Sequence, residues 1–405
     1  MACRYGIGLS LLGLLAFAGC DAPQAEFKPN LLYTRAKLVK SNRDLHKAEV
    51  RVQLEDIADI LTALMGTPDD PRLPVLPNVD LGSHLQLDQL RRAAGAVGST
   101  QAGTEHGLYR QHCVHCHGIT GDGLGPTAPF LNPYPRDYRR GLFKFKSTPT
   151  TLPPTKDDLH RILREGVAGT AMPSFKVLTE DEREALVQYV MYLSIRGQIE
   201  RALIYEISEN LDVGERLIDL SLKTKDPEAF QEQLDVVLAI AADTVAPWLE
   251  ANENITEVPP PPENWNTAES IAEGKRLFFT SLASCSKCHG DLALGDGQTN
   301  DYDEWTKELQ PGDEDALAEF LALGALPPRN ILPRNLRQGV YRGGRRPVDL
   351  FWRIKNGIAG TPMPAASQEL TNDQIWHLIA YVRSLPYDAI ALPRNYKPAV
   401  PRERL

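Results

Sequence analysis

Two stretches decide the fold of this chain: Cys-Val-His-Cys-His at residues 113–117 and Cys-Ser-Lys-Cys-His at residues 285–289. Each has the spacing C-x-x-C-H, in which two thiols about one helical turn apart can form thioethers to the edge of a porphyrin. The histidine that follows is then placed under the iron as its proximal ligand. One such pattern could arise by chance or as half of a zinc site, but two copies in matching surroundings indicate two covalent c-type haems. The residues concerned are Cys113, Cys116, His117, Cys285, Cys288 and His289.

A second repeat offers the other axial ligand. Gly-Val-Ala-Gly-Thr-Ala-Met-Pro at residues 166–173 recurs as Gly-Ile-Ala-Gly-Thr-Pro-Met-Pro at residues 357–364. A thioether opposite the histidine raises the potential of haem iron, and a Gly-rich loop that ends in proline would hold it rigidly. Methionine also fills gaps in cores, which is our interpretation of the helical Met65 and Met191. We predict Met172 and Met363 to be the ligands because they share one motif after each C-x-x-C-H.

Further repeats indicate a duplicated domain. We match Gly-Asp-Gly at residues 121–123 with Gly-Asp-Gly at 295–297, and the Pro-Arg segment 135–143 with the Pro-Arg segment 333–341. Each copy closes with apolar residues at helical spacing, and a capping box precedes each of these helices. The two boxes begin at Thr179 and Thr371.

These motifs and their order resemble the cytochrome c family, over roughly residues 99–196 and 268–385. The resemblance implies an N-terminal helix in each copy, at Leu108-Tyr109 and Leu277-Phe278, that crosses the terminal helix beside the haem. It also implies that the carbonyl of Pro126 orients the proximal histidine through its other ring nitrogen. The second copy has Gln-Thr-Asn at residues 298–300 and no such proline, so the orientation of its histidine is left open. The domains are also similar to those of the di-haem subunits of cbb3-type oxidases.

Two interpretations are open for the arginines in and around the two Pro-Arg segments: Arg136, Arg139, Arg140, Arg334, Arg337, Arg342, Arg345 and Arg346. They could be surface charge, or they could bind the haem propionates, since a guanidinium matches a carboxylate bidentately. Because the Pro-Arg pair itself is repeated, we expect Arg136 and Arg334 to be the propionate donors.

The N-terminus predicts export. Arg4 precedes an apolar stretch, residues 7–18, that is too short to span a bilayer, as in a secretory signal. The signal ends in Leu-Ala-Phe-Ala-Gly-Cys, which resembles the lipobox of bacterial lipoproteins and implies a lipid on Cys20. Ordinary cleavage near Ala18 or an uncleaved short anchor are the alternatives. With Cys3 removed, Cys20 lipidated and four cysteines holding haem, none of the six remains for a disulfide.

The sequence therefore predicts an all-α protein made of two cytochrome c-like domains and helical additions. Residues 20–98 form an extension that is either a tether or a strap on a haem domain, and an acidic insert at residues 301–325 is either a surface loop or a docking element. The full division is a signal at 1–19, the extension at 20–98, domain 1 at 99–197, a helical segment at 198–257, a Pro-rich linker at 258–267, domain 2 at 268–390 and a tail at 391–405.

Composition and ligand set favour electron transfer. A net charge of −9 argues against a nucleic-acid partner and permits docking to basic patches on redox proteins. Chemistry at haem needs an open sixth position, whereas both sites offer methionine. We expect a di-haem electron carrier, lipid-anchored on the periplasmic side of a bacterial membrane, whose partners are redox proteins and could include a respiratory oxidoreductase complex. A haem enzyme such as a di-haem peroxidase, and a role mainly in the assembly of a respiratory complex, are the alternatives.

Overall fold

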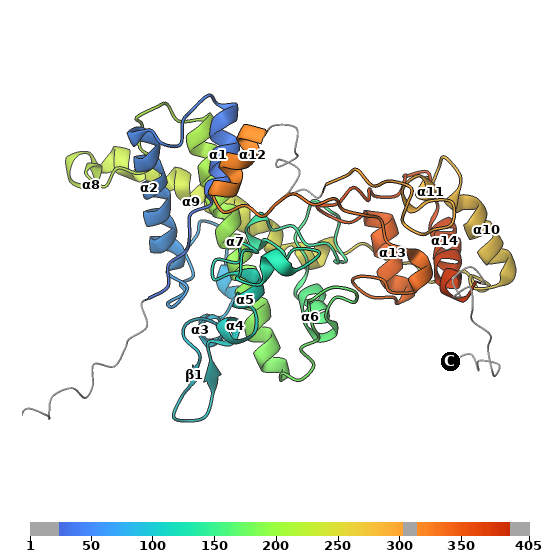
Figure 1. The fold of residues 1–405 in the computed structure, drawn as a ribbon. Helices are drawn as coiled ribbons and strands as arrows, with labels where there is room; N and C mark the ends of the chain where they lie inside the picture. Colours follow the sequence, from blue (N-terminus) through green and yellow to red (C-terminus); the bar gives the residue numbers. More distant parts are fainter. Residues whose placement is uncertain (1–23, 303–313, 389–405) are drawn as a thin grey trace, which may run out of the picture.

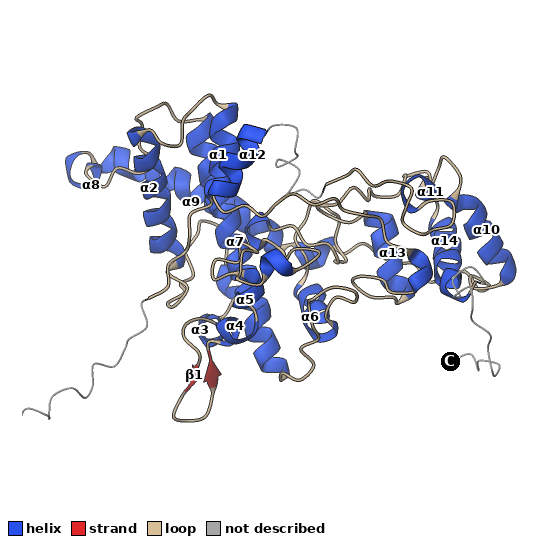
Figure 2. Cartoon of the chain, in the orientation of Figure 1, coloured by secondary structure: helices blue, strands red, loops and turns tan. Residues whose placement is uncertain are grey.

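The computed structural model describes residues 24–302 and 314–388, and this part of the chain is helical apart from one two-stranded ribbon (Figures 1 and 2). The ribbon pairs β1 (Gly98–Ser99) with β2 (Glu105–His106) in antiparallel order. The prediction of an all-α fold is confirmed. None of the described helices is long and apolar enough to cross a bilayer. The signal, Cys20 and the tail lie outside the described residues.

Domain 1 is built on the long helix α7 (Glu180–Glu209). The Thr179–Glu182 capping box starts this helix, and most of its residues are buried, so it forms the centre of the core. Around it lie α3 (Leu87–Ala93), α4 (Leu108–His112), α5 (Val114–His117), α6 (Lys156–Glu165) and the 3₁₀ turn η3 (Tyr138–Arg140). The crossing expected near Leu108-Tyr109 is present, because the ring of Tyr109 packs against that of Tyr189 on α7, with 5.0 Å between centroids.

The N-terminal extension packs on domain 1 along its described length. It consists of α1 (Leu31–Lys40), α2 (Ala48–Met65), the turn η1 (Leu81–Ser83) and, at its end, α3, which packs directly on α7. The apolar face of α2 enters the same core as α7, and the backbone N–H of Asn30 donates to Glu200 on α7 at 2.8 Å. Residues 24–98 therefore form a strap on the haem domain.

The boundary that the sequence places at residue 197 lies inside α7, which continues without a break to Glu209. The chain then forms α8 (Leu222–Lys225) and α9 (Pro227–Leu249), and α9 returns along α7. The indole Nε1 of Trp248 donates to Gln198 Oε1 at 2.7 Å, and the apolar face of α9 joins the core of domain 1. The segment after residue 197 thus enlarges domain 1.

Domain 2 has a separate core at the other end of the molecule (Figure 1). It contains α10 (Ala268–Phe278), α11 (Cys285–His289), α13 (Pro347–Asn356), α14 (Asn372–Ser384) and the 3₁₀ turn η6 (Leu336–Gln338). Helix α10 crosses α14 at Gly274, where a Cβ atom would lie 1.9 Å from the carbonyl oxygen of His377. Only glycine permits this approach, and it brings Phe278 against Tyr381 with 5.4 Å between ring centroids.

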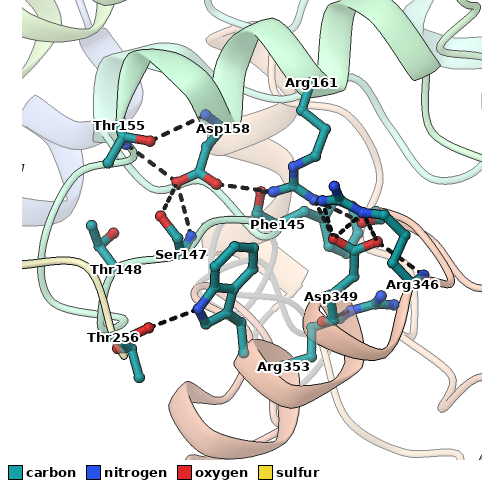
Figure 3. A network of polar contacts seen from close by, with 12 residues as sticks. Phe145, Ser147, Thr148, Thr155, Asp158, Arg161, Thr256, Arg346, Asp349 and Arg353 are labelled. Atoms are coloured by element: carbon teal, nitrogen blue, oxygen red, sulfur yellow. Dashed lines mark hydrogen bonds and ion pairs between the residues drawn. The ribbon is translucent and has the colours of Figure 1, made fainter. Parts of the chain in front are cut away.

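A buried polar network joins the two domains (Figure 3). Arg161 on α6 donates from Nη2 to Asp158 at 2.9 Å and from Nη1 to Asp349 at 3.0 Å. Both carboxylates occupy the N3 position of a capping box, on α6 and on α13, so they are equivalent positions of the two repeats. The arginine therefore holds the first turns of two equivalent helices together.

The acidic insert of domain 2 reaches back to the extension. Its described helix, α12 (Glu314–Ala322), lies beside α1, where Arg35 forms a bidentate ion pair with Glu319 (Figure 1). Leu323 packs against the small apolar cluster of Leu38, Leu45 and Val50. This part of the insert is thus an intramolecular contact; residues 303–313 lie outside the described residues.

Replacing Gly274 tests the crossing in domain 2. Gly274→Val should destabilise the domain by at least about 1–3 kcal/mol, because the new side chain meets backbone atoms that cannot move without separating the helices. Urea unfolding followed by circular dichroism measures the change. Lys275→Ala, an exposed change on the same helix, is the control and should stay within about 0.5 kcal/mol. Equal midpoints for the two variants would contradict the crossing.

Candidate functional site: two haem pockets

The proximal histidine of domain 1 is held by a backbone carbonyl. His117 ends α5, and its Nδ1 lies 3.1 Å from the carbonyl oxygen of Arg136. An Nδ1–H that donates to this carbonyl leaves Nε2 with the lone pair that binds a metal. The expectation that Pro126 supplies the carbonyl is therefore wrong. The Pro-Arg segment, which crosses under the ring, supplies it.

Domain 2 uses the same device. His289 Nδ1 lies 3.0 Å from the carbonyl oxygen of Arg334. This distance answers the question that the sequence left open, since the second copy needs no proline at the position of Pro126. The Pro-Arg pair therefore has the same backbone role in both domains, because the carbonyl of its arginine orients the proximal histidine.

The Gly-rich turns after the two histidines match in a different register from the one expected. The N–H of Gly123 donates to the carbonyl of His117 at 3.0 Å, and that of Gly295 donates to His289 at 2.9 Å. Gly125 and Gly297 likewise bond to Cys116 and Cys288, each at 3.1 Å. Residues 123–125 therefore correspond to residues 295–297. The prediction that Gly-Asp-Gly at 121–123 matches Gly-Asp-Gly at 295–297 is therefore wrong by two residues. The same three residue types occupy different positions in the two turns.

The two methionine loops have the same internal hydrogen bonds. The N–H of Met172 donates to Thr170 Oγ1 at 3.1 Å, and that of Met363 donates to Thr361 Oγ1 at 3.2 Å. The carbonyl of each methionine accepts a bond of 3.1 Å from the residue that follows the helix-ending glycine. Those glycines, Gly166 and Gly357, have φ of 68° and 74°. The loops are therefore two copies of one rigid structure.

A cavity of about 450 Å³ in domain 1 lies between the predicted ligands. His117 and Met172 both line it, together with apolar side chains from α6 and α7. Three cationic side chains also line it: Arg136, Lys144 and Arg342. No described residue in its lining is Asp or Glu. An apolar cavity with cations and no carboxylate fits a flat macrocycle that carries two propionates.

Burial keeps both proximal imidazoles neutral. It lowers the pKa of His117 to about 4, and it also lowers the pKa of His289 from its ordinary 6.5. A neutral imidazole is the form that ligates a metal. Burial likewise raises the pKa of Cys113 to about 12 and that of Cys285 to about 11, and none of the four described cysteines is in a disulfide. These two thiols are thus protonated, and the absence of disulfides leaves all four cysteines free for covalent attachment.

One side chain in the first pocket was missed from the sequence, and another lies in an unexpected place. Tyr138 stacks on the ring of His117 with 4.6 Å between centroids and an interplanar angle of 16°. Its position two residues after Arg136, inside the repeated Pro-Arg segment, was the available signal. Arg342 is one of the arginines for which the sequence left surface charge and propionate binding open. It belongs to domain 2 yet lines the cavity of domain 1, a placement across domains that the sequence did not indicate.

Comparison with known families agrees with this geometry. Residues 100–190 match the family described as cytochrome c oxidase, cbb3-type, subunit III, and residues 271–386 match the family described as cytochrome c. Together the matches cover about half of the chain. The chain is a di-haem member of the cytochrome c family. Its cofactors are two covalently bound c-type haems, whose iron supplies one-electron chemistry.

One solved structure is similar to the chain over most of its length. It is a chain of the reducing HAO-like protein complex of Kuenenia stuttgartiensis, with 25% identity and a TM-score of 0.45. The similarity covers 71% of this chain and 97% of that one. No curated protein matches the sequence.

Haem content tests the attachment residues. The native chain should contain two haems that stay bound after denaturation, and Cys285→Ala with Cys288→Ala should leave one, because the pocket of domain 1 has its own thiols. A pyridine haemochrome assay on purified protein gives the ratio. The matched variant, Cys113→Ala with Cys116→Ala, should also leave one haem. Two haems in either variant would contradict the assignment.

Proposed function

We propose that this protein is a membrane-tethered di-haem cytochrome that passes single electrons between respiratory redox partners. In domain 1, Cys113 and Cys116 attach the haem, and His117 and Met172 ligate its iron. In domain 2, Cys285 and Cys288 attach the second haem, and His289 and Met363 ligate its iron.

The observation that carries this proposal is that both domains offer the same two axial groups on rigid supports. Each histidine is neutral and fixed by a carbonyl at 3.0–3.1 Å, and each methionine is held by a loop with matching hydrogen bonds. Iron closed on both faces by protein ligands suits electron transfer, whereas reaction with peroxide or oxygen needs a displaceable sixth ligand. Two such sites favour a relay over an enzyme.

The partner surfaces are proposed from charge. The chain has a net charge of −9, which favours encounter with basic patches on a donor or acceptor and makes the encounter rate sensitive to salt. Export and tethering are proposed from residues 1–20, where the apolar signal ends at Cys20. Covalent haem attachment outside the cytoplasm agrees with this location.

Small-ligand binding tests the function. Native protein should not bind CO rapidly when reduced, and when oxidised it should show the weak near-infrared band of an iron–thioether bond. Met172→Ala and Met363→Ala should each open one site, lower its potential and allow CO to bind. Met191→Ala, which removes a core methionine, is the control and should leave both sites closed. Rapid CO binding or peroxide turnover by the native protein would favour the enzyme instead.

Membrane fractionation tests the tether. The native protein should partition into detergent, and Cys20→Ser with a working signal should release it, since each buried CH₂ of an acyl chain contributes about 0.8 kcal/mol to membrane binding. Immunoblots of membrane and soluble fractions measure this. An unlipidated variant that stays in the membrane fraction would contradict the lipid tether. Sequencing its N-terminus would then separate an uncleaved anchor, which keeps residues 1–19, from a partner complex that holds the cleaved protein.

A further inference from the structure

Arg342 is a domain 2 residue whose side chain lies in the pocket of domain 1. It lines the cavity that also contains His117 and Met172. It follows Tyr341, whose ring is buried in the core of domain 2, so its backbone belongs to that core. The first haem pocket is therefore built from both domains.

The backbone around Arg342 is fixed across the domain interface. Its carbonyl accepts a hydrogen bond from Arg353 Nη1 at 2.7 Å, and the carbonyl of Gly343 accepts one from Arg161 Nη1 at 3.2 Å. Gly343 lies directly on the ring of Phe145, where a Cβ atom would be 2.3 Å from Cγ. Phe145 lines the same cavity. These contacts position the Arg342 side chain from a rigid turn.

The Arg342 guanidinium has no anionic partner among the residues that the structure describes. Its Nε is buried without a hydrogen bond, and within residues 24–302 and 314–388 it forms no ion pair. Its neighbour Arg334 also forms none there, and burial together with Arg334 lowers the pKa of Arg342. Two close guanidinium groups repel each other, so an anion beside them would stabilise both.

The Arg334 side chain also turns towards domain 1. A Cβ atom built on Gly169 would lie 2.6 Å from Arg334 Nη2, so the Arg334 guanidinium packs on the loop that carries Met172. Its Nε donates to the carbonyl of Val340 at 2.8 Å, which fixes it there. The carbonyl of the same residue holds His289. The side chain predicted to serve the haem of domain 2 thus contacts the axial loop of domain 1.

We propose that Arg342 binds a propionate of the haem of domain 1 across the domain interface, so that domain 2 completes this pocket and sets its potential. A haem brings two carboxylates to a cavity whose described lining contains cations and no acid, and Arg342 is an unpaired donor facing it. A cation near the iron favours the reduced form, which carries less positive charge. The proposal needs both haems and does not depend on the tether or the partners.

Spectroelectrochemical titration tests the proposal. A Met363→His background separates the two transitions, because a second histidine lowers the potential of the haem of domain 2. In this background Arg342→Gln should lower the midpoint potential of the haem of domain 1 by about 59 mV. This is about a tenfold decrease in the equilibrium constant for its one-electron reduction. Arg342→Lys keeps the charge and should restore most of the potential. Arg345→Gln, an exposed arginine in the same loop, should leave it unchanged.

Each outcome decides the proposal. An unchanged potential of the haem of domain 1 in Arg342→Gln, an equal shift in Arg345→Gln, or a shift confined to the haem of domain 2 would overturn it. Haem content and circular dichroism confirm that each variant is assembled. If the glutamine variant does not assemble, Arg342→Met retains the apolar stem and provides the same comparison. Loss of potential in this variant with native CO inertness would leave the electron-transfer proposal intact.

Discussion

The ion pairs of Arg161 with Asp158 and Asp349 are the contact on which the arrangement of the two haem domains depends. Both carboxylates are 3% exposed, and each also caps the helix that leads to a methionine loop. Breaking a buried pair typically costs about 3–5 kcal/mol, because a charge is left without a partner. The same arginine donates to the carbonyl of Gly343, so one side chain links the two domains and also holds the turn beside the first pocket.

The two repeats are alike in construction and different in environment. His117 is 9% exposed and stacked on Tyr138, whereas the equivalent residue in domain 2, Leu336, has no ring to stack on His289. Burial disfavours the more highly charged oxidised iron, and nearby arginines do the same. The contacts across the interface therefore act on the pocket that is already the more enclosed. One duplicated sequence can in this way provide two sites with separate potentials.

The sequence predicted what is encoded locally. Each haem motif, methionine loop and capping box spans only a few consecutive residues, so the local sequence determines its geometry. The carbonyls that hold His117 and His289 come from residues 19 and 45 positions away, and the choice between Pro126 and the Pro-Arg segment depends on how the loop folds. For Arg342 the sequence left surface charge and propionate binding open, and it gave no indication of which haem the side chain would face. The cavity that it lines belongs to the other domain, and only the assembled interface brings the two together.

Helix α12 gives the molecule a second connection between its ends. The chain passes from domain 1 to domain 2 through the Pro-rich segment near residue 260, and α12 returns from domain 2 to pack on α1. Domain 2 is therefore secured to the rest by the chain itself, by the Arg161 contact and by this returning helix. A protease cut within the Pro-rich segment would yield two fragments that remain together as a non-covalent complex. Although its sequence predicts a spacer between the domains, the Pro-rich segment does not act as a hinge.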